Sequence, residues 1–205
     1  DHAYILKGSV LDLQGKSKEA IAVYKNALRT HQDNYLLYYN LALTLFNSKA
    51  SVTETTDALK HALRLNADHA SSHLLLGYVM MDQGKRVQSL LALYNFLLLE
   101  PKSGRAEEAL GILLQQLQQG VERTDEKTIN ILASDKTVKD EFAAAELSLS
   151  LLEASKTLGK NKDKTEHELF VDNTKIFFSL MGNLKKDHKG FWWDFYVPFF
   201  AAMES

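Results

Sequence analysis

The chain repeats itself at an interval of 34 residues. Residues 1–34 carry Tyr4, Gly8, Leu11, Gly15, Ala20, Tyr24 and Ala27, and residues 70–103 carry His73, Leu76, Gly77, Met80, Gly84, Leu93, Phe96 and Pro101 in the same pattern. Self-similarity at a fixed period predicts a stack of like units, because each unit needs its neighbours to bury its apolar face. This repeat constrains the fold more than any other feature of the sequence.

A third block, residues 35–69, lies between these two. It fits through Tyr38, Leu41, Ala42, Leu45, Leu59 and Ala62, with one residue added around the stretch SKASVTE. Gly8 and Gly77 predict a close approach of two helices, and Gly15 and Gly84 predict the turn between them. Because the middle block lacks the turn glycine, we expect a longer turn there.

The spacing of the apolar residues predicts helices. They recur at intervals of three and four, and the chain contains only two prolines. Together with the order aromatic, Leu-Gly, aromatic, Ala, aromatic and closing Pro101, this pattern resembles the tetratricopeptide repeat (TPR) family over about half of the chain. The resemblance implies an all-α fold, a right-handed α-solenoid of stacked antiparallel helix pairs.

The array is predicted to end after a partial fourth unit. Leu110, Gly111 and Leu114 fit a first helix within residues 104–120, but Arg123 occupies the position of a small residue. We therefore predict a TPR array over residues 1–120 and a helical C-terminal extension over residues 121–205 that packs on it.

Two helices are predicted in the extension. The first follows a capping box at Thr137 and Asp140, with an apolar face of Val138, Phe142, Ala145, Leu149 and Leu152. Residues 159–165, GKNKDKT, are predicted to be a solvated loop. The second helix, residues 166–186, carries a wide apolar face of Leu169, Phe170, Ile176, Phe177, Leu180, Met181 and Leu184.

The family resemblance implies a binding groove on the concave side, formed by the first helix of each unit. Its apolar lining would be Leu36, Tyr39, Leu43, Phe46, Leu74, Tyr78 and Met81, with Asn40 beside them. His2, Ile5, Ser9 and Asp12 would make the first unit's end more polar. Two alternatives stay open: the C-terminal helices fill this groove, or some of the rings pack between repeats.

One TPR subclass binds the carboxyl terminus of chaperones through Lys, Asn, Asn, Lys and Arg on these helices. The matching positions here hold Ile5, Ser9, Asn40, Ser71 and Leu75, of which only Asn40 agrees. A free carboxylate would meet no cation at those positions. We therefore predict that the chain does not bind chaperones in this way.

The composition excludes some classes of partner and of covalent or metal site. Lysine and arginine total 24 against 26 acidic residues, so the chain lacks the positive field that nucleic acids require. Cysteine is absent, which excludes disulfides and thiolate metal sites. No apolar run is long enough for a membrane span, so we expect a soluble protein. The chain begins at Asp1, which suggests a removed leader and, in that case, an exported or periplasmic location.

Three short motifs resemble catalytic or metal-binding sequences, but we interpret each as a turn, a packing position or a helix start. GKS at 15–17 lacks the first glycine of a phosphate-binding loop and falls in a turn. His69 and His73 have metal-ligand spacing, but His73 occupies the aromatic packing position of the repeat. TEHE at 165–168 is predicted to be the first turn of a helix. We expect no enzyme activity, no cofactor and no metal.

The stretch FWWDFYVPFF, residues 191–200, contains seven aromatic residues: Phe191, Trp192, Trp193, Phe195, Tyr196, Phe199 and Phe200. We expect it to fold back as a short helix that seals the C-terminal helices, with Asp194 facing water and Pro198 in the first turn of a final helix. The alternatives are a docking surface for a partner or a second copy, and an interfacial membrane anchor.

The leading functional hypothesis is a non-catalytic scaffold that holds a peptide or helix of a partner protein in the groove. The alternative is a structural, self-assembling subunit that forms homo-oligomers through residues 191–200. A third hypothesis, a helical-repeat enzyme, needs a polar cluster that the sequence does not display.

Overall fold

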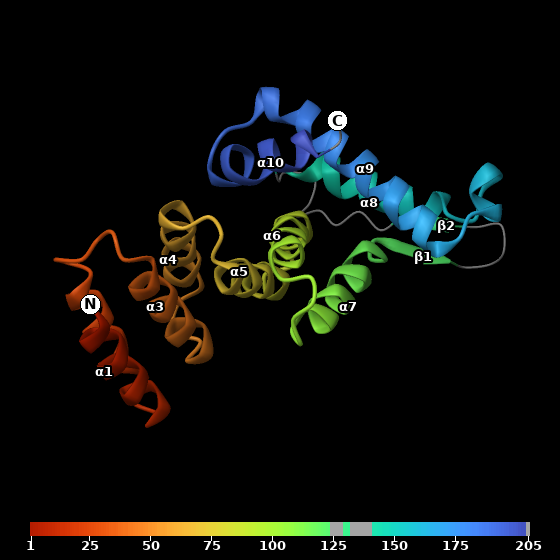
Figure 1. Cartoon of the computed structure of the whole chain (residues 1–205). Helices are drawn as coiled ribbons and strands as arrows, with labels where there is room; N and C mark the ends of the chain where they lie inside the picture. The colour runs from red at the N-terminus through yellow and green to blue at the C-terminus, as the bar shows by residue number, and fades with distance from the viewer. Residues whose placement is uncertain (124–128, 132–140, 204–205) are drawn as a thin grey trace. The chain divides into compact units, whose positions relative to one another are not determined.

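The computed structural model describes residues 1–123, 129–131 and 141–203 (Figure 1). They divide into two compact units. The first comprises residues 1–85 and 92–109, and the second comprises residues 86–91 and 110–205. The predicted division into an array over 1–120 and an extension over 121–205 stays a prediction, and each unit is described here by itself.

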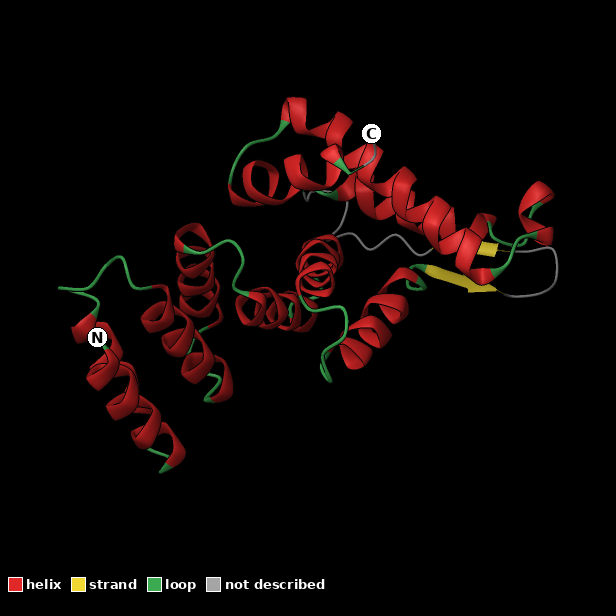
Figure 2. Ribbon diagram, in the orientation of Figure 1, coloured by secondary structure: helices red, strands yellow, loops and turns green. Residues whose placement is uncertain are grey.

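Helix pairs build the first unit, as the repeat predicts. The helices are α1 (His2–Leu13), α2 (Ser17–Ala27), α3 (Tyr35–Asn47), α4 (Val52–Leu65), α5 (Ala70–Asp82) and α6 (Arg86–Leu99), the last of which spans both units. Within the first unit, α1 packs on α2, α2 on α3, α3 on α4 and α4 on α5. The all-α, TPR-type stack is confirmed (Figure 2), and the three predicted repeat bounds stay a prediction.

The turns inside the three helix pairs share one geometry. Gly15, Lys49 and Gly84 occupy corresponding positions and have φ angles of 75°, 52° and 67°. In each turn the next residue donates its backbone N–H to a carbonyl five residues earlier, at Leu11, Leu45 and Met80. The middle repeat therefore makes the same turn without glycine, and Lys49 takes the left-handed conformation. Its extra residue lies after Lys49, because α4 begins three residues later and α2 and α6 begin two residues after their glycines.

Small residues bring the helices of the first unit close together. A Cβ atom on Gly8 would lie 2.3 Å from the Tyr24 ring, so α1 and α2 need glycine at this point. Ala20 and Ala27 are fully buried beside Tyr24, and Leu59, Ala62 and Leu63 are buried at the corresponding part of α4. This core holds the first helix of each repeat in place.

The predicted partial fourth repeat, residues 104–120, contains one helix. Helix α7 (Ala106–Leu117) forms, but β1 (Val121–Arg123) follows it and pairs antiparallel with β2 (Ile129–Ile131), with Glu122 opposite Asn130. The sequence did not predict this hairpin. Leu110, Gly111 and Leu114 are exposed, although the repeat pattern predicts that a first helix buries them. Ala109 and Leu113 are buried instead.

The C-terminal helices of the second unit are α8 (Ala143–Ser155), α9 (Glu166–Leu184) and α10 (Val197–Ala202), and α9 contacts both α8 and α10. Phe142, Ala145 and Leu149 are buried as predicted. Thr137, Val138 and Asp140 of the predicted capping box lie outside the described residues. A capping box does occur at Thr165 and Glu168, where the side chains and backbone N–H groups bond reciprocally.

Two details of this unit differ from the sequence predictions. Residues 159–163 of the predicted loop form a short 3-10 helix, and residues 185–187 form another after α9 ends at Leu184. Ile176 is 51% exposed, although it was assigned to the buried face of α9, whereas Phe177, Phe178 and Met181 are buried. The buried face is therefore narrower at Ile176 and includes Phe178.

A buried ion pair joins the start of α6 to α8 within the second unit. The Arg86 guanidinium lies 3.7 Å from the Glu146 carboxylate and donates to Ser150 and to the Leu117 carbonyl. Burial lowers the pKa of Arg86, and the Glu146 carboxylate acts in the opposite direction. Glu146 also accepts the backbone N–H of Val87, so the pair is hydrogen-bonded on both sides.

Candidate binding groove

The predicted groove residues share one face of α3 and α5 in the first unit. Leu36, Tyr39, Asn40, Leu43, Phe46, Tyr78 and Met81 are half-buried, and Leu74 is buried. On α3 they recur at intervals of three and four, so the side chains line one side of the helix. These residues therefore form a partly exposed, mainly apolar surface with tyrosine rings. Leu74 is buried beneath it.

A histidine joins the tyrosines of this surface. The His69 ring meets the Tyr39 ring edge to face at 4.8 Å and the Tyr35 ring at 5.0 Å. His69 Nδ1 lies 2.8 Å from the Ser72 hydroxyl, and burial lowers the pKa of the His69 imidazole. Sequence analysis missed Tyr35 and His69 as groove residues. The available signal was that Tyr35 begins α3 and that His69 immediately precedes α5.

Arg105 places a positive charge next to one of the clamp positions, which the sequence analysis did not predict. From the residue before α7 its guanidinium donates to the Ser71 hydroxyl at 3.0 Å, and Ser71 occupies a lysine position of the chaperone-binding subclass. The same guanidinium donates to both carboxylate oxygens of Glu100 at 2.7 Å, which lowers the pKa of Glu100. Arg105 also lies over the Phe96 ring at 5.4 Å. The arginine belongs to the predicted partial fourth repeat and lies in the same compact unit as Ser71, and its charge is already paired with Glu100.

The polar residues of the first repeat serve packing. Asp12 accepts hydrogen bonds from Ser17 at 2.8 Å and from buried Thr44 at 3.1 Å, so it links the first and second repeats. The Ser9 hydroxyl lies 3.2 Å from the Tyr24 hydroxyl. Ile5 is half-buried and His2 is exposed. Asn40 donates to the Leu36 carbonyl within its own helix, so its side chain is occupied locally.

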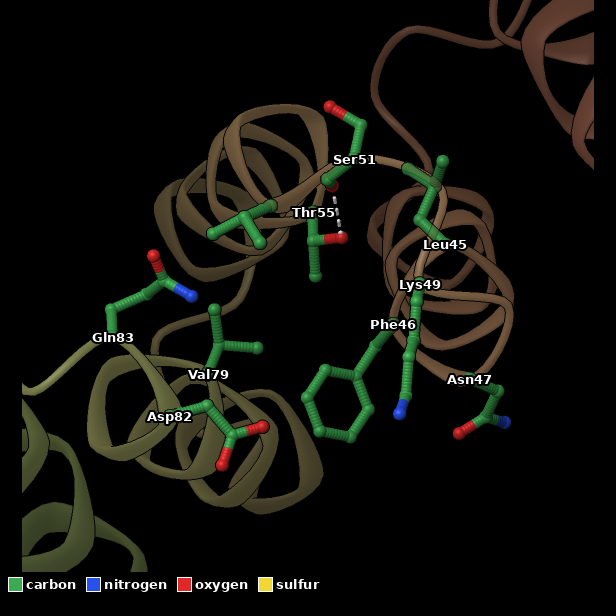
Figure 3. A pocket seen from close by; sticks show the side chains of 10 residues that line it. Leu45, Phe46, Asn47, Lys49, Ser51, Thr55, Val79, Asp82 and Gln83 are labelled. Carbon is green, nitrogen blue, oxygen red and sulfur yellow. Dashed lines mark hydrogen bonds between the residues drawn. The ribbon is translucent and has the colours of Figure 1, made fainter.

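A pocket of about 410 Å³ opens beside the groove between the second and third repeats. It is lined by Leu45, Phe46, Asn47, Lys49, Ser51, Val52, Thr55, Val79, Asp82 and Gln83. The ends of α3 and α5 and the start of α4 contribute these residues, and the side chains of Phe46, Thr55, Val79 and Asp82 point toward one another across the space (Figure 3). Phe46 belongs to both the groove and the pocket.

The histidine pair has packing contacts on both rings. His73 is fully buried and its Nε2 donates to the Ala67 carbonyl at 2.8 Å. Burial lowers its pKa to about 4, against a smaller opposing effect of that hydrogen bond. The imidazole of His73 is therefore neutral at physiological pH and occupies the aromatic packing position, as the repeat pattern predicted.

The C-terminal aromatic segment contributes to the core of the second unit. Trp193, Tyr196 and Phe200 are fully buried and Trp192 nearly so; Phe191 and Phe195 are half-buried, and Phe199 is exposed. Trp193 stacks on Phe142 at 4.7 Å and donates through Nε1 to Glu141 at 2.8 Å. Phe200 stacks on Phe178 of α9 at 4.4 Å. The segment folds back on the C-terminal helices, as predicted.

The backbone of the aromatic segment changes from a π-helical turn to an α-helix near Pro198. Residues 192–196 form a π-helical turn directly before α10, and Pro198 lies in the first turn of α10. Proline cannot donate an N–H to the preceding turn, and a widened turn accommodates it. Asp194 is exposed as predicted and accepts the Gly190 N–H and the Lys185 ammonium.

Comparison with known proteins agrees with the repeat assignment. A family model described as TPR repeat matches residues 8–48, which run from α1 to the end of α3. Residues 8–48 therefore match the tetratricopeptide repeat, and the first unit has the antiparallel helix pairs of that fold.

Among solved structures, the chain is similar to the first TPR of Spaghetti (RPAP3) bound to the HSP90 peptide SRMEEVD. The TM-score is 0.53 and the sequence identity 24%, over 56% of this chain and 90% of that chain. At this identity the likeness shows the fold alone. No curated protein matches the chain. Over the part of the chain that the structure describes, no helix is long and apolar enough to cross a membrane.

Proposed function

We propose that the first unit is a non-catalytic scaffold that binds a peptide or helix of a partner protein along the groove. The observation that carries this proposal is the row of half-exposed side chains on the first helices of the second and third repeats: Leu36, Tyr39, Leu43, Phe46, Tyr78 and Met81. Tyrosine rings and a flexible methionine are typical of protein-binding surfaces. The RPAP3 domain of similar fold holds a peptide, which supports the same use here.

The bound segment is not expected to be a chaperone carboxyl terminus. Ile5, Ser71 and Leu75 occupy the three cationic positions of the clamp with side chains that carry no charge. Arg105 reaches Ser71, yet Glu100 already holds its guanidinium through two hydrogen bonds. A carboxylate would have to displace Glu100, so the groove favours apolar anchors over a free carboxyl group.

A selection from a random 12-residue peptide library tests the scaffold proposal. Enriched peptides should bind the protein saturably by fluorescence anisotropy and lose at least about tenfold in affinity when Tyr39→Ala or Leu43→Ala is introduced. Leu65→Ala is the matched control, since Leu65 is exposed on α4 and outside the groove. No enrichment, or equal binding by the groove variants in a folded protein, would refute the proposal.

The peptide SRMEEVD serves as the second probe. We expect no saturable anisotropy change with this peptide, whereas Glu100→Gln should release Arg105 and allow weak, salt-sensitive binding. Saturable binding by the unmodified protein would show that the chain takes chaperone termini despite its departures from the clamp.

The self-assembly alternative has less support. Most rings of residues 191–200 pack inside the second unit, and Phe199 is the ring of that segment left exposed. A homo-oligomer through this segment would therefore rest mainly on Phe199.

A further inference from the structure

We propose that the pocket between the second and third repeats is a specificity site for one large apolar side chain of the bound segment. Lys49 and Asp82 would select an acidic and a basic residue that flank this side chain. The inference rests on the proposed function, because Phe46 lines both the groove and the pocket. It adds the sequence class of the partner: an apolar anchor between opposite charges.

The pocket adjoins the one-residue insertion of the second repeat. Lys49 occupies the position of Gly15 and Gly84, and the added residue separates it from the start of α4. Lys49, Ser51 and Val52, which flank this insertion, all line the pocket. The site therefore depends on a feature that distinguishes the second repeat from its neighbours.

The floor of the pocket is apolar. Leu45, Thr55 and Val79 are buried there. The Thr55 hydroxyl donates to the Ser51 carbonyl at 2.7 Å, so this polar group is already satisfied (Figure 3). Val52 is half-exposed and lies with Phe46 among the lining residues. A volume of about 410 Å³ with such walls suits an aromatic or long aliphatic side chain better than a polar one.

Two opposite charges border this floor. Lys49 comes from the turn after α3, and Asp82 ends α5 on the other side of the pocket (Figure 3). The ion pairs found among the described residues include neither side chain. A segment with an acidic residue toward Lys49 and a basic residue toward Asp82 would match both charges, and only one chain direction achieves this.

Nuclear magnetic resonance with small probes tests the pocket directly. N-acetyl-L-phenylalaninamide and N-acetyl-L-leucinamide should shift the backbone amide signals of residues 45–55 and 79–83 saturably. Val52→Trp should place a ring over the opening and reduce these shifts severalfold, while Val52→Ala retains them. Deletion of Ala50, which restores the length of the other turns, should also weaken binding. Shifts scattered over the molecule, or unchanged by Val52→Trp, would overturn the pocket assignment.

A pair of peptides tests the charge selection. The protein should bind one of Ac-Glu-Leu-Lys-NH2 and Ac-Lys-Leu-Glu-NH2 at least about threefold more tightly than the other, and the double variant Lys49→Glu, Asp82→Lys should reverse the preference. Equal binding of both peptides, or an unreversed preference, would overturn the selection by these charges.

The two proposals fail in different ways. Library peptides that need Tyr39 and Leu43 but are indifferent to Val52→Trp would leave the scaffold standing and remove the pocket from it. Probe binding in the pocket without any peptide that depends on Tyr39 or Leu43 would refute the scaffold, and with it the role of the pocket in partner selection.

Discussion

At the scale of single residues, Gly8 is the position where one atom matters most. Tyr24 is 1% exposed, so its ring has no room to move away from a methyl group placed 2.3 Å from it. We expect Gly8→Ala to lower the free energy of unfolding by about 1–3 kcal/mol, measured by urea denaturation. The loss arises from overpacking between α1 and α2.

Gly111 is the matched control for this substitution. It lies within α7, is exposed, and a Cβ atom there would meet nothing within 4 Å. Gly111→Ala should therefore raise stability by up to about 1 kcal/mol through helix propensity. A Gly8→Ala protein as stable as Gly111→Ala would contradict the close approach of α1 and α2.

His73 makes stability depend on pH. Its pKa of about 4 in the folded chain lies below its ordinary value of 6.5, so the unfolded chain binds the proton more tightly. Stability should hold above pH 6.5 and fall as the pH drops toward 4, by on the order of 3 kcal/mol from this residue. His69, whose pKa is also lowered by burial, adds a loss of the same sign.

Urea midpoints between pH 7 and pH 4 measure this effect. His73→Phe should flatten the dependence, because a phenyl ring keeps the packing and binds no proton. His61→Phe is the control, since His61 is exposed and stacks on Tyr38 at 5.1 Å. An unchanged pH profile in His73→Phe would mean that other groups cause the acid sensitivity.

At the scale of elements, the turn between α3 and α4 holds removable strain. Lys49 has a φ of 52°, where a side chain costs energy and glycine does not. Lys49→Gly should raise the thermal midpoint and the free energy of unfolding by about 0.5–1 kcal/mol. The reverse change, Gly84→Lys at the corresponding turn, should lower both quantities by a similar amount. If the two substitutions changed stability in the same direction, that result would argue against a shared turn geometry.

Leu6 of α1 is far more exposed than the leucine at the corresponding position of α5. Leu6 is 67% exposed, while Leu75, at the corresponding position of α5, is 6% exposed. Leu75→Ala should therefore cost about 2–4 kcal/mol of stability, because it opens a cavity. Leu6→Ala should change stability by less than about 0.5 kcal/mol in the same urea assay. Similar losses for both variants would show that α1 is covered in solution.

At the scale of the whole molecule, the aromatic segment is expected to behave as core. Trp192 and Trp193 are the only tryptophans of the chain, and they are 8% and 0% exposed. Their fluorescence emission should be blue-shifted, protected from acrylamide and independent of protein concentration. Protection that disappears on dilution would show that a second copy covers the segment instead.

Helix positions could be read from the sequence because they depend on local spacing. Gly15 and Gly84 marked two turns. The sequence did not indicate that Lys49 adopts the glycine conformation, since the tertiary packing of the pair imposes this on an unfavourable residue. The paired strands β1 and β2 were missed because strands of three residues carry almost no periodic signal.

Some features of the candidate groove could also be predicted from the sequence, and others could not. The half-buried row on α3 and α5 followed from the family pattern, because period and face are local properties of a helix. Arg105 at Ser71, His69 against Tyr39, and the bond from Thr44 to Asp12 join residues from different repeats. Such contacts depend on the stacking of the repeats, so they were not predicted.

The sequence by itself determined the helical repeat, its period and the faces that each helix turns inward, since these follow from apolar spacing and from small residues at fixed positions. Only the tertiary structure decided which polar groups meet. It paired Arg105 with Glu100, placed Trp193 between Phe142 and His188, and opened a pocket beside the inserted residue. The physical reason is that a repeat pattern specifies distances along the chain, whereas pairing and cavities depend on distances across it.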